Sequence, residues 1–257
     1  MKILAIGDVT SPAGLEHLVK NLWKFRKEKG VDFCVVNGEN ASFLHGITAE
    51  QAEKLNRGGA DVITGGNHTM NARGAAQLLE ERGEVLRPIN YGDAVVGRGY
   101  GIFDADGYKV LVINAMGTVN IEPRLDSPYP YIDRVLSELW GKYDVAVLDI
   151  HAEATGEKLA LGYAYDGKIN VVFGTHTHVP TADARILPCG TGYVSDLGMC
   201  GESGGVLGMD APTVVEKMRT RLPIRFKAAE GTPVADGVIF DCDVKSGRVV
   251  SIERVKF

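Results

Sequence analysis

The strongest constraint on the fold is the stretch at residues 171–178, which reads VVFGTHTH. Its apolar first half predicts a short buried strand, and two histidines follow that strand directly. Because alternate residues of an extended backbone point to the same side, we expect His176 and His178 to face one pocket. Strand ends of open α/β sheets are common ligand sites. Taken alone, the pair is also compatible with two histidines at a solvated strand end.

Four other largely apolar runs predict strands, at residues 2–8, 33–37, 61–64 and 144–150, and the first of them is typical of a central strand in a parallel sheet. Helical patterns lie between them, beginning at Pro12, at the capping box of residues 48–51, at residue 73, at residue 131 and at residue 157. This alternation favours an α/β fold in which the carboxyl ends of the strands share one edge of a sheet.

The rest of the sequence is less regular. We expect a hairpin over residues 99–114, a loop over 121–131, strands at 181–187 and 190–195, and a helix from Asp210 to Arg219. From Arg225 onwards an antiparallel ribbon is expected, with turns at 230–231 and 245–247. The glycine-rich segment 201–208 fits either a mobile lip or a plain surface loop. We expect one domain, residues 1–257, with a small cap-like excursion around 85–130.

Composition narrows the class of protein. The 257 residues carry a net charge of −5, which argues against an extended nucleic-acid surface. No apolar run approaches the roughly 20 residues that a membrane span needs, and the apolar start is too short for a secretory signal. The four cysteines form no Cys-x-x-Cys pair. They are read as reduced thiols of a cytoplasmic protein.

Potential metal ligands follow five of the predicted strands. They are Asp8, Glu39 with Asn40, Asn67 with His68, His151, and His176 with His178. Four of the six histidines of the chain belong to this set. Each residue has an ordinary alternative, such as a turn former for Asp8 and Asn67, a solvated carboxylate for Glu39 or a core histidine for His151. Their joint occurrence at strand ends favours a shared metal site.

The chemistry of these side chains limits the metal. Carboxylate, amide oxygen and imidazole without thiolate suit iron, manganese, zinc or cobalt. The set exceeds what one ion uses, whereas two ions with a carboxylate between them would use it all. Two divalent ions, two carboxylates and a bridging hydroxide leave a charge of about +1, which attracts an anion such as a phosphate ester. A histidine beside the metals would protonate the leaving group.

These motifs resemble the calcineurin-like metallophosphoesterases, and more closely the bacterial YmdB family within them. The resemblance spans nearly the whole chain and includes the motifs at residues 7–8, 38–40, 66–68, 151–158, 174–178, 185–188 and 204–210. It implies an α/β fold of layered α/β/β/α sheets, with a dinuclear metal site at the carboxyl ends of the strands. In the wider superfamily a histidine follows the first aspartate as Asp-x-His, but here Asp8 is followed by Val9 and Thr10.

The resemblance also implies roles for individual residues. Asp8, Glu39, Asn40 and His178 would hold the first ion, with Asn40 in place of the missing histidine. Glu39 would bridge to the second ion, whose other ligands would be Asn67, His151 and His176, and His68 would be the proton donor. The metals would be iron, with manganese as the alternative, and no other cofactor is expected. Glu153 and Asp196 are candidates for orienting the histidines, and Thr118, Arg98 and Arg87 are either near the pocket or structural.

The activity implied is hydrolysis of small cyclic nucleotides, chiefly 2′,3′-cyclic nucleotides to 3′-phosphates, by attack of the metal-bridged hydroxide. Two alternatives stay open: a phosphomonoesterase or protein phosphatase, and a regulatory protein with slow turnover that binds a nucleotide or an RNA-processing partner. We expect a homo-oligomer that binds no membrane.

Overall fold

The computed structural model describes residues 1–43 and 45–257 of the chain, and two β-sheets form the centre of this part. The first sheet contains β1 (Lys2–Ile6), β2 (Asp8–Val9), β3 (Phe33–Asn37), β4 (Val62–Thr64), β5 (Val85–Leu86), β12 (Met199–Glu202), β13 (Pro233–Asp243) and β14 (Arg248–Lys256). The second contains β6 (Tyr100–Ala105), β7 (Tyr108–Met116), β8 (Val145–His151), β9 (Val171–Thr175), β10 (Arg185–Ile186) and β11 (Gly192–Val194). The site described below depends on how these sheets stack.

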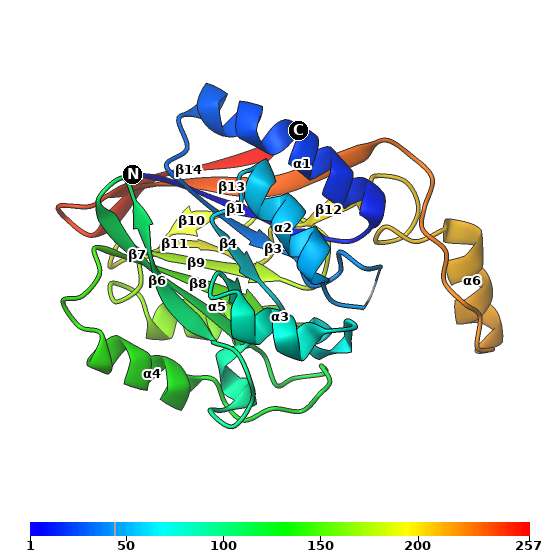
Figure 1. The fold of residues 1–257 in the computed structure, drawn as a ribbon, viewed down its shortest axis with the longest axis horizontal. Helices are drawn as coiled ribbons and strands as arrows, with labels where there is room; N and C mark the ends of the chain where they lie inside the picture. Colours follow the sequence, from blue (N-terminus) through cyan, green and yellow to red (C-terminus); the bar gives the residue numbers. More distant parts are fainter. Residues whose placement is uncertain (44) are drawn as a thin grey trace.

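Helices lie on the outer faces of the two sheets (Figure 1). They are α1 (Pro12–Lys29), α2 (Ala49–Gly58), α3 (Ala75–Glu81), α4 (Tyr129–Glu138) and α5 (Thr155–Ala164). The other helical elements are α6 (Ala211–Thr220) and the short 3₁₀ turns η1 (Thr69–Asn71) and η2 (Ile89–Tyr91). The capping box expected at residues 48–51 is present at the start of α2. α6 projects from the body at the end of a long excursion (Figure 1).

Three apolar cores define four layers. α1, α2 and α3 pack on one face of the first sheet, and α4 and α5 pack on the outer face of the second. Between the sheets lies a core in which β1 contributes Ile3 and Ala5, whereas Leu4 and Ile6 of the same strand face the helices. This alternation follows from the two-residue period of a strand. The expected α/β/β/α layering is therefore confirmed.

The sequence had suggested a purely parallel sheet, but the first sheet contains both parallel and antiparallel strand pairs. β1 pairs in parallel with β3, and β3 with β4, so their carboxyl ends lie at one edge. On its other side, β1 pairs antiparallel with β13, which turns into β14. The C-terminal ribbon is thus part of the central sheet, and it begins at Pro233 rather than at Arg225.

The structure corrects several predicted strands. The run at residues 2–8 is broken at Gly7, where an added Cβ would lie 2.1 Å from the carbonyl oxygen of Gly198. Asp8 therefore starts a separate strand, β2, that pairs with β12. The strand expected at 181–187 is reduced to Arg185–Ile186, and β5 and β12 were not predicted. Within the described part of the chain, no helix combines the length and apolar character needed to cross a membrane.

Candidate metal centre

The predicted ligands come from the carboxyl ends of strands in both sheets. Asp8, Glu39 and Asn67 follow or belong to strands of the first sheet, whereas His151 ends β8 of the second and His176 follows β9. The two sheets meet where Oε1 of Glu39 lies 3.0 Å from Nε2 of His151. The sequence led us to expect one shared sheet edge, but the structure uses the facing ends of two sheets.

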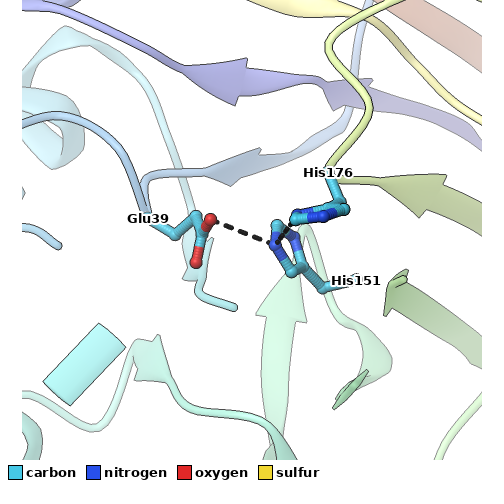
Figure 2. A group of neighbouring side chains, drawn as sticks. All are labelled: Glu39, His151 and His176. Atoms are coloured by element: carbon cyan, nitrogen blue, oxygen red, sulfur yellow. Dashed lines mark hydrogen bonds and ion pairs between the residues drawn. The ribbon is translucent and has the colours of Figure 1, made fainter. Parts of the chain in front are cut away.

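Three of these residues contact one ring nitrogen of a fourth, His151. We call the four residues the tight cluster: Glu39, Asn67, His151 and His176. Nε2 of His151 lies 3.0 Å from Oε1 of Glu39, 3.0 Å from Oδ1 of Asn67 and 3.1 Å from Nδ1 of His176. Figure 2 shows the side chains of Glu39, His151 and His176 pointing toward one another. One ring nitrogen carries at most one proton, so it cannot satisfy three neighbours.

Three others, Asp8, Asn40 and His178, form a looser group that we call the open cluster. Nε2 of His178 lies 3.3 Å from Nδ2 of Asn40 and 3.9 Å from Oδ1 of Asp8. Asp8 and Asn40 are fully or nearly fully buried. Within the described residues, Oδ1 of Asp8 and Oδ1 of Asn40 are buried without a hydrogen-bond donor. Such oxygens are costly unless a cation or donor faces them.

Asn40 connects the two clusters, because its Nδ2 also donates to Oε1 of Glu39 at 3.2 Å. The second oxygen of Glu39 accepts the backbone N–H of His68 at 2.9 Å. Gly66 makes this close approach possible, since an added Cβ would lie 2.4 Å from Oε2 of Glu39 and 2.3 Å from Cδ2 of His151. The glycine before Asn67 and His68 is therefore required by packing at the site.

The two histidines after β9 adopt unusual backbone conformations. The φ angles are 102° at His176 and 62° at His178, both in the region that side chains with a Cβ disfavour. The backbone N–H of His176 donates to Oδ2 of Asp8 at 3.0 Å, which ties this loop to the first sheet. Nε2 of His176 also lies 3.1 Å from Glu153, so the predicted contact between that carboxylate and a histidine is present.

A buried polar network behind His151 was not predicted from the sequence. Nδ1 of His151 lies 2.9 Å from Oγ1 of Thr175, which donates to Oδ1 of Asp149 at 2.8 Å. Asn37 donates to the other oxygen of Asp149 at 3.0 Å. These residues fix the plane of the imidazole ring. A charged residue inside the apolar run at 144–150 was the signal that could have revealed this network.

The electrostatic balance differs between the histidines. Burial disfavours the charged His151 ring, but Glu39 and Asp8 outweigh burial and raise its pKa to about 9. Burial and repulsion by His151 lower the pKa of His176 to about 3. Burial also raises the pKa of Asp8 above its usual range. A bound cation would favour the deprotonated ligands throughout, because it replaces the proton as the positive charge.

The pKa values of Glu39 and His68 are both lowered. Burial opposes ionisation of Glu39, but its contacts with His151 and His68 prevail and lower its pKa to about 2. His68 is half-buried at the rim, where Nδ1 lies 3.0 Å from Nδ2 of Asn71. Burial lowers the pKa of His68. A lower pKa makes its protonated ring a stronger acid, although less of it is protonated at neutral pH.

Three other residues considered from the sequence have structural contacts. Arg87 donates to the backbone carbonyls of residues 88, 92, 95 and 96, so it holds a loop together. Thr118 binds Glu157 through both its backbone N–H and its hydroxyl. The backbone carbonyl of Arg98 accepts the N–H of Arg87 at 2.9 Å, beside its bridge to Leu86. The interpretation of these three as structural residues fits these contacts.

Two stacked sheets, with carboxylate, amide and imidazole groups at their facing ends, give the fold that this chain shares with proteins of known structure. An NAD nucleotidase of Haemophilus influenzae shares this fold, with a TM-score of 0.58 over 100% of this chain and 55% of that chain, at 15% identity. The chain belongs to the YmdB-like protein family, whose model matches residues 4–255.

Two relatives match this chain over nearly the whole length of both proteins. A 2′,3′-cyclic-nucleotide 2′-phosphodiesterase of Bacillus subtilis is 40% identical over 255 residues, which are 99% of this chain and 96% of the relative. The crystal structure of a phosphatase of Mycoplasma pneumoniae is 30% identical, with a TM-score of 0.90 over 100% of this chain and 93% of that chain. The family resemblance inferred from the sequence is confirmed.

Proposed function

We propose that this protein is a phosphodiesterase with two divalent metal ions that hydrolyses 2′,3′-cyclic nucleotides to 3′-phosphates. The observation that carries the proposal is the crowding around Nε2 of His151, where an oxygen of Glu39, an oxygen of Asn67 and a nitrogen of His176 converge within 3.0–3.1 Å. Side chains from two sheets that share so small a volume are arranged to share a cation.

The residues present fit a pair of metal ions. Glu39, His151 and His176 alone offer three ligand atoms within 4.8 Å of one another. The orphaned oxygens of Asp8 and Asn40 lie in the neighbouring open cluster, where a second cation would satisfy both. With oxygen and imidazole donors and no thiolate, the set suits iron or manganese. We propose iron, with manganese as its substitute.

We assign Asp8, Asn40 and His178 to one ion, and Asn67, His151 and His176 to the other. Glu39 contacts both groups, through Asn40 on one side and His151 on the other, so it is the bridging carboxylate. Bound together, the two ions would supply an activated water at neutral pH and positive charge for the phosphoryl oxygens. The neutral form of His176 that its lowered pKa favours is the form that binds a metal.

His68 is proposed as the proton donor to the leaving alkoxide. Its backbone is fixed by Glu39, and its ring is placed at the rim beside Asn67, 3.5 Å from Nδ2 of that residue. The ring is thus next to the proposed ligands without contacting the nitrogen of His151 on which they converge. In hydrolysis of a 2′,3′-cyclic nucleotide, protonation of the 2′ oxygen accompanies cleavage of its bond to phosphorus and leaves the 3′-phosphate.

The experiment is an assay of the purified protein with Fe²⁺ or Mn²⁺ on bis-p-nitrophenyl phosphate and on 2′,3′-cyclic AMP. We expect metal-dependent turnover of both, a product that carries the 3′-phosphate, and a loss on the order of 10²–10⁴-fold in His68→Ala with metal content unchanged. His17→Ala is the matched control, because His17 contacts only α1 and the C-terminal Phe257 among its hydrogen-bond partners. Turnover of His68→Ala at the parent rate would show that the role of His68 is wrong.

The phosphatase from Mycoplasma pneumoniae among the relatives favours one alternative substrate class, the phosphate monoesters. The same metal pair would serve both reactions. Rates on p-nitrophenyl phosphate and on its bis ester, measured with one metal-loaded preparation, separate them. A higher rate on the monoester would replace the phosphodiesterase assignment.

The remaining proposals concern the chain as a whole. We propose that residues 1–257 act as a single catalytic unit with a cap-like excursion around 85–130. We further propose a homo-oligomeric, cytoplasmic enzyme that acts on a small substrate rather than on an extended nucleic acid. The net charge of −5 supports the last point, because a nucleic-acid surface would be basic.

A further inference from the structure

Lys158 on α5 is a charged side chain that is fully buried. Its exposed fraction is 0%, and its Nζ lies 2.8 Å from Oδ2 of Asp196, whose side chain is 1% exposed. Removing two charges from water costs several kcal/mol per ion, which their attraction offsets only with good geometry and further hydrogen bonds. A buried ion pair of this kind does not by itself indicate a gain in folding stability. Its role is therefore inferred from the other groups that the two side chains contact.

Those contacts lead to the histidine loop. Oδ2 of Asp196 accepts the backbone N–H of Thr177 at 3.0 Å, in addition to the ammonium group of Lys158. Oδ1 of Asp196 accepts the N–H of Gly198 at 2.9 Å. Thr177 is the residue between His176 and His178. The carboxylate of Asp196 therefore holds the backbone midway between the histidines assigned to the two ions.

The backbone that Asp196 holds is strained. His176 and His178 both have positive φ angles, a conformation that residues with a Cβ disfavour. Such a conformation persists only where the surroundings impose it. Asp8 anchors one end through the N–H of His176, and Asp196 anchors the centre through the N–H of Thr177.

Lys158 supplies the positive charge beside the buried carboxylate of Asp196. Without the ammonium group, the charge of Asp196 would be uncompensated in the interior. Gly174 of β9 provides the path for this lysine, since an added Cβ there would lie 2.7 Å from Cδ of Lys158. The glycine before the Thr-His-Thr-His sequence thus permits the lysine to reach its partner from beneath the strand.

We propose that Lys158 and Asp196 are positioning residues that set the metal affinity of the site by holding the His176–His178 loop in its strained conformation. The inference rests on the proposed metal site and adds residues that do not touch the ions. Its physical content is that the ion pair keeps the loop in the binding conformation before a metal arrives, so the metal need not impose that conformation.

The test measures Mn²⁺ affinity by the electron paramagnetic resonance signal of free Mn²⁺, independently of turnover. Lys158→Met removes the charge with a side chain of similar length and leaves Asp196 unpaired, so we expect affinity to fall about 10- to 100-fold. Asp196→Asn keeps an oxygen that can accept from Thr177 but leaves the lysine unpaired. The double variant Lys158→Met, Asp196→Asn restores neutrality and is expected to regain most of the affinity.

Arg26→Met is the matched control. Arg26 is also buried, and its Nη1 lies 2.8 Å from Oδ2 of Asp61, but this pair links α1 to the start of β4 and contacts none of the proposed ligands. We expect Arg26→Met to unfold at a lower temperature while its Mn²⁺ affinity stays at the parent value. The comparison separates loss of stability from loss of positioning.

Each outcome decides a specific question. If Lys158→Met and the double variant bind Mn²⁺ as tightly as the parent, the ion pair is structural only and the inference is wrong, although the proposed function stands. If the parent itself binds no Mn²⁺ or Fe²⁺, the proposed function fails. If Lys158→Met does not fold, the Mn²⁺ affinities of the double variant and of Asp196→Asn are compared instead. The inference is also wrong if the double variant binds Mn²⁺ no more tightly than Asp196→Asn.

Discussion

The tight and open clusters lie side by side in one site, yet they handle charge differently. In the tight cluster, Glu39 faces His151, whose pKa of about 9 gives the cluster a positive charge of its own. In the open cluster, Asp8 is a buried carboxylate with a raised pKa and an oxygen without a donor. The first cluster balances the charge of Glu39 with its own histidine, whereas Asp8 in the second lies 3.7 Å from Nδ1 of that same histidine and keeps an oxygen without a hydrogen-bond donor among the described residues.

This comparison has a consequence for stability. Removing the partner of a paired buried carboxylate destabilises the fold, whereas a buried carboxylate with an unsatisfied oxygen opposes folding until a ligand arrives. The same ligand type, a carboxylate at a strand end, should therefore have opposite effects on the metal-free protein in the two clusters. The following predictions address this contrast, beginning with the largest effect.

Glu39→Gln is expected to have the largest effect, because Glu39 contacts both clusters. It removes the charge that faces His151, so turnover on bis-p-nitrophenyl phosphate should fall on the order of 10³-fold. The metal-free variant should also lose about 3–5 kcal/mol of unfolding free energy, because one partner of a buried charged pair is removed. Steady-state kinetics and urea unfolding measure the two effects, and an unchanged unfolding free energy would argue against internal charge balance.

His151→Ala and His178→Ala should differ in metal stoichiometry. His151 contacts three members of the tight cluster, so its removal should abolish that ion and weaken the other through Glu39. His178→Ala should retain about one ion per chain, held by the tight cluster. Elemental analysis of protein dialysed against Mn²⁺ gives the stoichiometry. Equal metal content in the two variants would contradict the division into two clusters.

Metal removal should lower the melting temperature. With free Mn²⁺ at 100 times the dissociation constant, binding stabilises the folded state by about 2.7 kcal/mol. For a chain of this size that corresponds to roughly 5–10 °C between the metal-loaded and chelator-treated protein. Scanning calorimetry provides the measurement, and identical melting curves would exclude binding to the native site.

Asp8→Asn should change the unfolding free energy least, and we expect it to stabilise the metal-free protein. The amide removes a buried negative charge and offers a donor toward Nε2 of His178, so the metal-free protein should gain about 1 kcal/mol. Its Mn²⁺ affinity should nevertheless fall, because an amide is a weaker ligand than a carboxylate. Urea unfolding in chelator with calorimetric Mn²⁺ titration tests both. A destabilised metal-free variant would show that Asp8 is as well balanced as Glu39.

The sequence predicted the site better than the surrounding topology. The predicted ligands end or follow a strand, because the apolar runs that mark buried strands also mark where they end, although Asp8 also begins β2. Hydrophobic periodicity did not predict the edge of the second sheet, because it does not indicate which strands pair. The break at Gly7 depends on Gly198, a contact far along the chain that no local pattern reveals.

The supporting residues were the hardest to predict. Asp149 and Lys158 act through buried contacts with Thr175 and Asp196, and their value depends on distances that only the folded chain defines. From the sequence alone, Lys158 was one residue of a family motif without a role. A buried charge is recognisable only once its partner is known, whereas a histidine at a strand end suggests its chemistry at once.

The most direct test of the central claim is anomalous X-ray diffraction from crystals of this protein grown with Mn²⁺. The account predicts two anomalous peaks per chain, one bounded by Asp8, Asn40 and His178 and one by Asn67, His151 and His176, with Glu39 in contact with both. A single peak, or peaks outside these two clusters, would contradict it.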